Sequence, residues 1–134
     1  MAITFANALG IHEHALQLRG MRSEILANNI ANSDTPGFKA RDMDFVSILQ
    51  GKMRAQQTTM KMVTSDSRHL SGSAGFVADD VLMYRIPLQA SVDGNTVDEQ
   101  IENAAFARNA LQHQASFQFL NGRFTGMIKA LRGE

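Results

Sequence analysis

Four histidines are the residues of this chain best suited to metal chemistry: His12, His14, His69 and His113. The His-x-His pair is a candidate chelate, because neutral imidazole is a common ligand of transition metals. Residues two apart on a helix diverge, however, and no acidic or thiolate residue completes a recognisable ligand set. The chain has no cysteine, which excludes disulfides, thiolate metal sites and a cysteine nucleophile. We therefore expect no metal and no other cofactor.

The candidates for catalysis are two close aspartate pairs, Asp42 with Asp44 and Asp79 with Asp80. Paired carboxylates can act as general acid and general base. Both pairs lie in polar connecting segments, where solvated side chains or helix caps are the simpler interpretation. Residues 72–75 lack the lysine and following helix of a phosphate-binding loop, and their serine lacks the strand and helix that flank a nucleophile elbow. These patterns predict no catalytic residue and no enzyme.

Length and charge exclude several further classes of function. The chain has 134 residues, one domain at most, with 13 basic and 13 acidic side chains and a formal net charge of zero. No net field concentrates the protein on nucleic acid or on an anionic membrane. The amino terminus lacks the basic and apolar regions of a cleavable signal, and no apolar stretch approaches membrane-spanning length. We expect no nucleic-acid partner and no direct membrane insertion.

A long amino-terminal helix is predicted over residues 5–32, which contain no proline and carry apolar residues at helical spacing. Thr35 precedes Pro36 and is therefore driven out of the helical region, and Pro36-Gly37 suits the two central positions of a type II turn. The helix must end by about residue 33 or 34.

The middle segment, residues 36–95, is expected to be irregular and contains a flexible glycine-serine loop at residues 71–75. Within it, residues 45–49 are predicted to form a short helix that Gly51 ends. Residues 58–63 and 81–86 are candidate strands, which would form one small β-hairpin.

A second long helix is predicted from Val97 to about Leu131. Thr96 and Glu99 fit a capping box, in which the Thr96 hydroxyl would accept a hydrogen bond from the Glu99 amide. Steps of four and three along this helix match the 3.5-residue period of a coiled-coil seam. The seam positions are Phe106, Ala110, His113, Phe117, Leu120, Phe124, Met127 and Leu131. A second stripe, at Val97, Ile101, Ala104, Leu111 and Ala115, lies around the helix from the seam. Two apolar stripes on different sides of one helix need more than one neighbouring element or subunit to cover them.

The predicted fold class is therefore mainly α, with long terminal helices packed as a coiled-coil-like pair. At 1.5 Å per residue the helices would be about 40 Å and about 50 Å long. Burying five large seam residues contributes on the order of 8–15 kcal/mol. Fixing the backbone costs about 1–2 kcal/mol per residue, so a lone helix pair is marginal and association is predicted. The alternative is that the middle segment folds over the helices and completes an ordinary monomeric core.

The run ANNIANSDTPGFK at residues 27–39 closely resembles the signature near the amino terminus of flagellar rod and hook proteins. Its asparagines fall in the last turns of the predicted helix, where amide side chains can bond free carbonyls or a neighbouring helix. Three further stretches carry the resemblance, namely ARDMDF at 40–45, YRIP at 84–87 and DGNTVD at 93–98. Residues 56–81 match least. The signature residues expected to serve assembly are Asn28, Asn29, Ile30, Asn32, Thr35, Pro36, Gly37 and Phe38.

The resemblance implies a structural subunit of the proximal rod of the flagellar basal body, in the periplasm. It implies that residues 1–35 and 96–134 form the inner layer of a helical tube, while residues 36–95 face outward. Such a tube transmits torque and conducts exported subunits. The residues expected to pack between helices or subunits are Phe106, Leu111, Phe117, Leu120, Phe124, Met127 and Leu131.

The implied partners are copies of the chain itself, other rod proteins, the basal-body ring and export-gate adaptor, and the flagellar type III export apparatus. Export would occur without cleavage of a signal peptide. Phe5 and Leu9 have the form of an early-substrate recognition element, although residues one helical turn apart equally suit a core.

Two functions from other classes stay open on the residues alone. One is a peptidoglycan hydrolase associated with the rod, since a growing rod must cross the cell wall. The other is a cytoplasmic adaptor that binds exported subunits. Zymography separates the first from a rod subunit, and cell fractionation separates the second.

Overall fold

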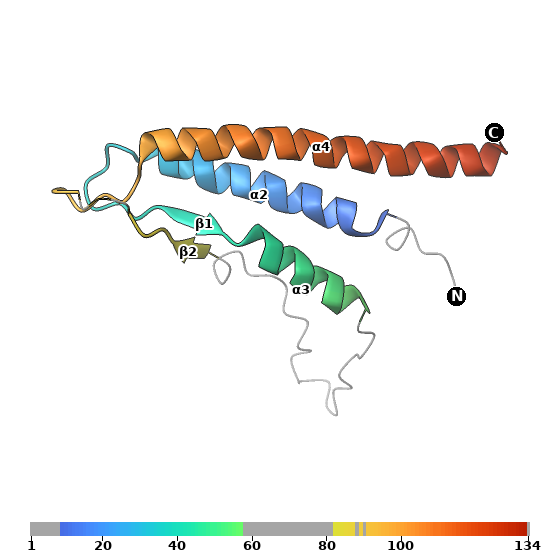
Figure 1. The fold of residues 1–134 in the computed structure, drawn as a ribbon, viewed down its shortest axis with the longest axis horizontal. Coiled ribbons are helices and arrows are strands. Elements are labelled where there is room, and N and C mark those ends of the chain that lie inside the picture. The colour runs from blue at the N-terminus through green and yellow to red at the C-terminus, as the bar shows by residue number, and fades with distance from the viewer. Residues whose placement is uncertain (1–8, 58–81, 88, 90, 134) are drawn as a thin grey trace, which may run out of the picture.

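In the computed structural model, which describes residues 9–57, 82–87, 89 and 91–133, two long antiparallel helices lie side by side (Figure 1). They are α2, which spans Ile11–Ala31, and α4, which spans Glu99–Arg132. The shorter elements are β1 (Arg41–Met43), α3 (Phe45–Gln57) and β2 (Leu82–Tyr84), and they lie on the side of α2 away from α4. The predicted mainly α fold with paired terminal helices is confirmed.

The ends of α2 follow from local backbone chemistry. Gly10 has a φ of 56°, outside the right-handed helical region, so α2 begins at Ile11 and the long helix predicted from residue 5 is interrupted. At the other end, the Phe38 amide donates to the Thr35 carbonyl at 3.3 Å, and Gly37 has a φ of 74°. These values confirm the predicted type II turn.

The start of α4 differs from the predicted capping box. The cap is Asp98, whose carboxylate accepts hydrogen bonds from the Gln100 and Ile101 amides, each at 3.1 Å. The Thr96 hydroxyl instead accepts from the Ala40 amide at 2.8 Å. The prediction was wrong because a tertiary partner occupies the threonine, and a charged cap two residues later satisfies the free amides.

The small sheet pairs β1 with β2 in antiparallel register, with Arg41 opposite Tyr84 and Met43 opposite Leu82. The strand predicted at residues 81–86 is present as β2. The other candidate strand, residues 58–63, lies outside the described residues. The partner of β2 is β1, for which no strand was predicted; the sheet in the described chain has these two strands.

The helix predicted at residues 45–49 is present as α3, but its predicted end at Gly51 is wrong, since α3 continues to Gln57. Asp44 caps the first turn by accepting from the Val46 and Ser47 amides, each at 3.1 Å. A single glycine inside a helix costs only about 1 kcal/mol relative to alanine, which a well-capped helix tolerates.

The cluster of buried apolar residues in the described chain lies between α2, β1 and α3. Leu18, Met43 and Ile48 form its buried centre, and Met21, Ile25, Phe45 and Leu49 pack against them. The residues of α4 that are buried are polar, Glu102 and Asn109. None of the helices in the described part of the chain combines the length and hydropathy needed to cross a bilayer.

Two matched glycine substitutions test this description of the backbone. Gly37→Ala places a Cβ at positive φ and should lower the free energy of unfolding by about 1 kcal/mol. Gly51→Ala replaces a glycine inside α3, where an added Cβ meets nothing within 4 Å, and should raise it by about 0.5–1 kcal/mol. Urea unfolding followed by circular dichroism measures both. Shifts of the same sign would contradict the assignment.

Candidate functional site: the polar junction between the long helices

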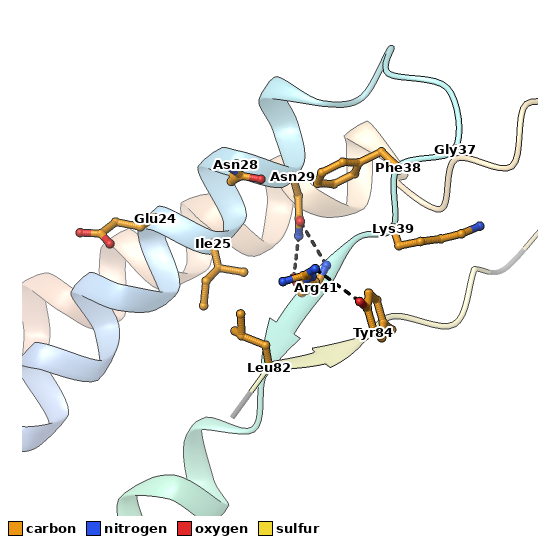
Figure 2. Close-up of a pocket in the computed structure, with 10 residues that line it drawn as sticks. All are labelled: Glu24, Ile25, Asn28, Asn29, Gly37, Phe38, Lys39, Arg41, Leu82 and Tyr84. Carbon is orange, nitrogen blue, oxygen red and sulfur yellow. Dashed lines mark hydrogen bonds between the residues drawn. The ribbon is translucent and has the colours of Figure 1, made fainter. Parts of the chain in front are cut away.

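Asn29 lies near the end of α2, and its side chain is 1% exposed. Its Nδ2 donates to the Arg41 carbonyl at 2.7 Å, while its Oδ1 accepts from the Arg41 amide at 3.1 Å, so the side chain pairs with β1 as a neighbouring strand would (Figure 2). The same Nδ2 donates to Glu102 Oε2 at 3.1 Å. This signature asparagine therefore ties α2 to both the sheet and α4.

A series of charged side chains continues from Glu102. Arg85 Nη1 lies 3.1 Å from Glu102 Oε1, and Arg85 Nη2 donates to Asp42 Oδ2 at 2.6 Å. Arg22 binds the same carboxylate at two points, with Nε 2.9 Å from Oδ1 and Nη2 2.8 Å from Oδ2. A bidentate pair fixes orientation as well as distance. We call this cluster of Asn29, Glu102, Arg85, Asp42 and Arg22 the polar junction.

The charges of the polar junction are balanced, since two guanidinium groups meet two carboxylates. Burial raises the pKa of the Asp42 carboxyl, but hydrogen bonds from Arg22, the Met43 amide and Arg85 outweigh burial, and the pKa lies below its ordinary value. Asp42 is therefore ionised at neutral pH and binds both arginines. The junction has the chemistry of a structural clamp between two helices and a sheet.

A second set of contacts closes the end of α2. The buried Asn95 amide donates to the carbonyls of Asn32, Ser33 and Thr35 at 3.0, 2.7 and 3.0 Å. These carbonyls lie in the turn that follows α2, where the Asn32 and Thr35 carbonyls also accept from the Thr35 and Phe38 amides. The Asn95 Oδ1 accepts from the Val97 amide at 2.8 Å. A residue just before α4 thus caps the end of α2.

The backbone on either side of these caps is also paired. The Gly37 amide donates to the Asp93 carbonyl at 2.9 Å, and the Thr96 amide donates to the Phe38 carbonyl at 3.0 Å. Residues 37–40 and 93–96 therefore run alongside each other. All four stretches that carry the family resemblance meet here, since they supply Asn29, Asp42, Arg85 and Asn95.

Seven residues after Glu102, Asn109 forms a second buried polar contact between the long helices. Its Nδ2 donates to the Arg19 carbonyl and to the Ser23 hydroxyl, each at 2.9 Å. Arg19 extends from this contact over the Phe45 ring, with its Cζ 3.6 Å from the ring centroid. Asn109 thus connects α4 to α2, and Arg19 connects α2 to α3.

The predicted signature residues divide into buried and surface groups. Asn28 is exposed, and Asn32 Nδ2 donates to the Asn28 carbonyl at 2.8 Å. Thr35 Oγ1 donates to Asn32 Oδ1 at 3.1 Å, in the turn that leads to Pro36. Ile30 is half-buried. Of the candidate export residues, Leu9 is buried and Phe5 lies outside the described residues.

Four of the seven side chains predicted to pack between helices or subunits are exposed in the single chain. Leu111 is 70% exposed and Phe117 is 58% exposed, and Phe106 and Leu131 are also exposed. The half-buried members are Leu120, Phe124 and Met127. The part of α4 that faces α2 near its start carries Glu102 and Asn109 instead of the predicted apolar seam. The packing of the exposed residues against other subunits stays a prediction.

Sequence reasoning missed Glu102, Asn109 and Arg22. Arg85 and Asp42 lie in stretches that carry the family resemblance, but Arg85 was given no role and Asp42 was singled out only as a catalytic candidate. One sequence signal was available for Glu102 and Asn109, because they lie one heptad apart on a long helix. No local pattern reveals the arginines, since their carboxylate partners lie at distant positions in the chain.

A pocket of about 610 Å³ lies beside the polar junction, between α2, the turn after it and the sheet (Figure 2). Glu24, Lys39 and Arg41 supply its charges, while Ile25 and Leu82 are among its apolar residues. In the described chain, no three histidine, aspartate or glutamate side chains gather as metal ligands. The lining has no pair of carboxylates, so it carries no acid–base constellation.

Comparison with known proteins gives consistent matches. A family model described as "Flagella basal body rod protein" matches residues 9–39. Over 135 aligned positions, the chain is 44% identical to the flagellar basal body rod protein FlgB of Aeromonas hydrophila, covering 100% of this chain and 99% of the relative. It is 43% identical to FlgB of Escherichia coli (strain K12), with 93% of each chain covered, and 40% identical to FlgB of Cereibacter sphaeroides, with 97% and 98% covered.

Adjacent asparagines test the role of the polar junction. Asn29→Ala removes the hydrogen bonds to the Arg41 amide and carbonyl and one of the two partners of the Glu102 carboxylate, so it should lower the free energy of unfolding by about 2–3 kcal/mol. Asn28→Ala removes an exposed amide from the same turn and should change it by less than about 0.5 kcal/mol. Chemical denaturation compares the two variants. Equal losses of unfolding free energy in the two variants would show that the buried hydrogen bonds of Asn29 do not stabilise the fold.

The depressed pKa of Asp42 makes stability depend on pH in a defined direction. Because the folded-state pKa is the lower one, the Asp42 contribution is complete above the unfolded value of about 4 and is lost as pH falls through the folded value. Asp42→Asn should therefore cost about 2 kcal/mol at pH 7, and the difference from the native chain should shrink below about pH 4.

Urea unfolding at pH 7, 5, 4 and 3 measures this difference. Asp34→Asn, at an exposed position, serves as the control and should have little effect at any of these values. An Asp42→Asn deficit that stayed constant from pH 7 to pH 3 would contradict the role of the ionised carboxylate.

Proposed function

We propose that this chain, which belongs to the FlgB family of flagellar basal body rod proteins, assembles with other rod subunits through α4, held against α2. Membership of the family makes the chain a structural subunit of the proximal rod. The observation that carries this proposal is the set of large apolar side chains that α4 leaves exposed. The family is structural, so the chain is not an enzyme and the hydrolase alternative is dropped.

The exposed apolar residues of α4 occupy more than one side of the helix. Phe106 and Phe117 are eleven residues apart and lie on one flank, whereas Ile101 and Phe119 are eighteen residues, or five turns, apart and share another. Leu111 lies on the outer side. Soluble monomers seldom leave such a surface uncovered. One neighbour cannot cover two flanks of a helix, so the distribution supports contacts with at least two other subunits.

The placement of the remaining elements supports an outward position for the middle of the chain. The strands and α3 lie on the side of α2 away from α4 (Figure 1). If α4 faces the inside of a tube, residues 36–95 face outward. In this arrangement the polar junction clamps the sheet to both helices, which suits a subunit that transmits torque around a channel for exported subunits.

The partners proposed for α4 are copies of this chain and other rod proteins. Contacts with the basal-body ring and export-gate adaptor, and passage through the type III export apparatus, belong to the same proposal through the family resemblance. Leu9 is buried in the folded subunit. A role for Leu9 in export therefore requires that the apparatus bind the chain before this part folds.

Charged substitutions on the exposed side of α4 test the proposal. Leu111→Asp and Phe117→Asp change exposed residues, so the monomer should keep its helix content and lose less than about 1 kcal/mol of stability. Buried in a subunit interface, an unpaired carboxylate opposes assembly, and we expect loss of swimming in soft agar and of intact rods in isolated basal bodies.

The matched controls are Ser47→Asp and Gln50→Asp, which add the same charge at exposed polar positions of α3, on the side of α2 away from α4. We expect these variants to swim. Normal rods in the Leu111→Asp and Phe117→Asp strains would exclude α4 as the assembly surface.

A further inference from the structure

Over its first turns, where α4 carries Glu102 and Asn109, the side of the helix that faces α2 is not the most apolar one. Glu102 and Asn109, each 1% exposed, are its fully buried residues there, and they lie two turns apart. Phe106 and Phe117, by contrast, point away from α2 enough to be exposed. Hydrophobic burial alone would place Phe106 and Phe117, and not Glu102 and Asn109, against α2.

The polar side of α4 has a matching surface on α2. Asn29 donates to Glu102 at 3.1 Å, and the Arg19 carbonyl and the Ser23 hydroxyl accept from Asn109 at 2.9 Å. Leu26 is fully buried between Ser23 and Asn29, three residues from each, so it lies on the same side of α2. The interface therefore alternates polar contacts with an apolar one.

A modest rotation of α4 would replace this interface with an apolar one. Phe106 follows Glu102 by four residues and Phe117 follows Asn109 by eight, so at 100° per residue the apolar flank lies about 40° to 80° around the helix. Rotation by that angle would bury both phenylalanines against α2. It would also remove them from the surface that the proposed function assigns to other subunits.

We propose that Glu102 and Asn109 select which side of α4 faces α2, and thereby reserve the apolar flank for neighbouring subunits. This inference rests on the proposed function of that flank. In the rotated arrangement Glu102 and Asn109 would leave their partners, so buried Asn29 and half-buried Arg85 would each lose one partner, and Ser23 and the Arg19 carbonyl would lose theirs on α4. An unpaired buried polar group lowers the stability of the fold, whereas an apolar interface can pack in several alignments of similar free energy. Polar contacts therefore specify one arrangement at some cost in stability.

Single-cysteine reporters can measure the orientation of α4, because the chain has no cysteine of its own. Ala105→Cys lies at a half-buried position beside the α2 interface, and Ala110→Cys lies at an exposed position of the apolar flank. In the native background, maleimide should label position 110 faster than position 105. Rotation toward the apolar flank would slow labelling at 110 and accelerate it at 105.

The test variant is Asn109→Leu, and its control is Asn103→Leu, at an exposed asparagine of the same helix. We expect Asn109→Leu to narrow or reverse the ratio of the two labelling rates, with helix content and thermal midpoint retained, and Asn103→Leu to leave the ratio unchanged. These rates are measured on the purified subunit, so they do not depend on whether Leu111→Asp blocks rod assembly.

Three outcomes would overturn the inference. The first is a native labelling ratio in Asn109→Leu. The second is an equal change in Asn103→Leu, which would mean that added leucine acts anywhere on α4. The third is loss of helix content with rapid labelling at both positions, since Asn109 would then hold the fold and would not select a face.

Discussion

The buried carboxylate of Glu102 is the constraint on which the arrangement of the two long helices depends. A carboxylate removed from water is stable only where hydrogen-bond donors or positive charges meet it. Here α2 supplies Asn29 and the segment after β2 supplies Arg85. Arg85 in turn needs Asp42, and Asp42 is held by Arg22. One buried charge therefore fixes the positions of α2, α4 and both strands relative to one another.

The family signature takes on a physical meaning in this setting. The signature residue Asn29 hydrogen-bonds to the backbone of β1 as a neighbouring strand would. The turn at Pro36-Gly37 brings residues 37–40 alongside residues 93–96. Asn95 then completes the end of α2 from the opposite terminal segment of the chain. Polar residues in this region of the sequence close the helix pair at one end, while the exposed apolar residues of α4 are those that we propose for contacts between subunits.

Sequence rules that use only neighbouring residues correctly predicted the helix ends that depend on those residues. The end of α2 follows from Pro36 and Gly37, and the end of α4 lies at Arg132, one residue beyond the predicted end. Local rules failed where distant partners intervene: Thr96 binds Ala40, and β1 pairs with β2 across the intervening residues. For the site, the resemblance marked Asn29, but periodicity of apolar residues cannot reveal an inward face built from Glu102 and Asn109. The burial of a charge depends on partners that only the folded chain brings together.

The most direct measurement is the structure of this subunit inside an isolated basal body, at a resolution that shows side chains. It should show Glu102 bound to Asn29 and Arg85 of its own chain, with Leu111 and Phe117 packed against other subunits. If Phe117 packed against its own α2, or if the apolar side of α4 remained in contact with solvent in the assembled rod, the central claim would be contradicted.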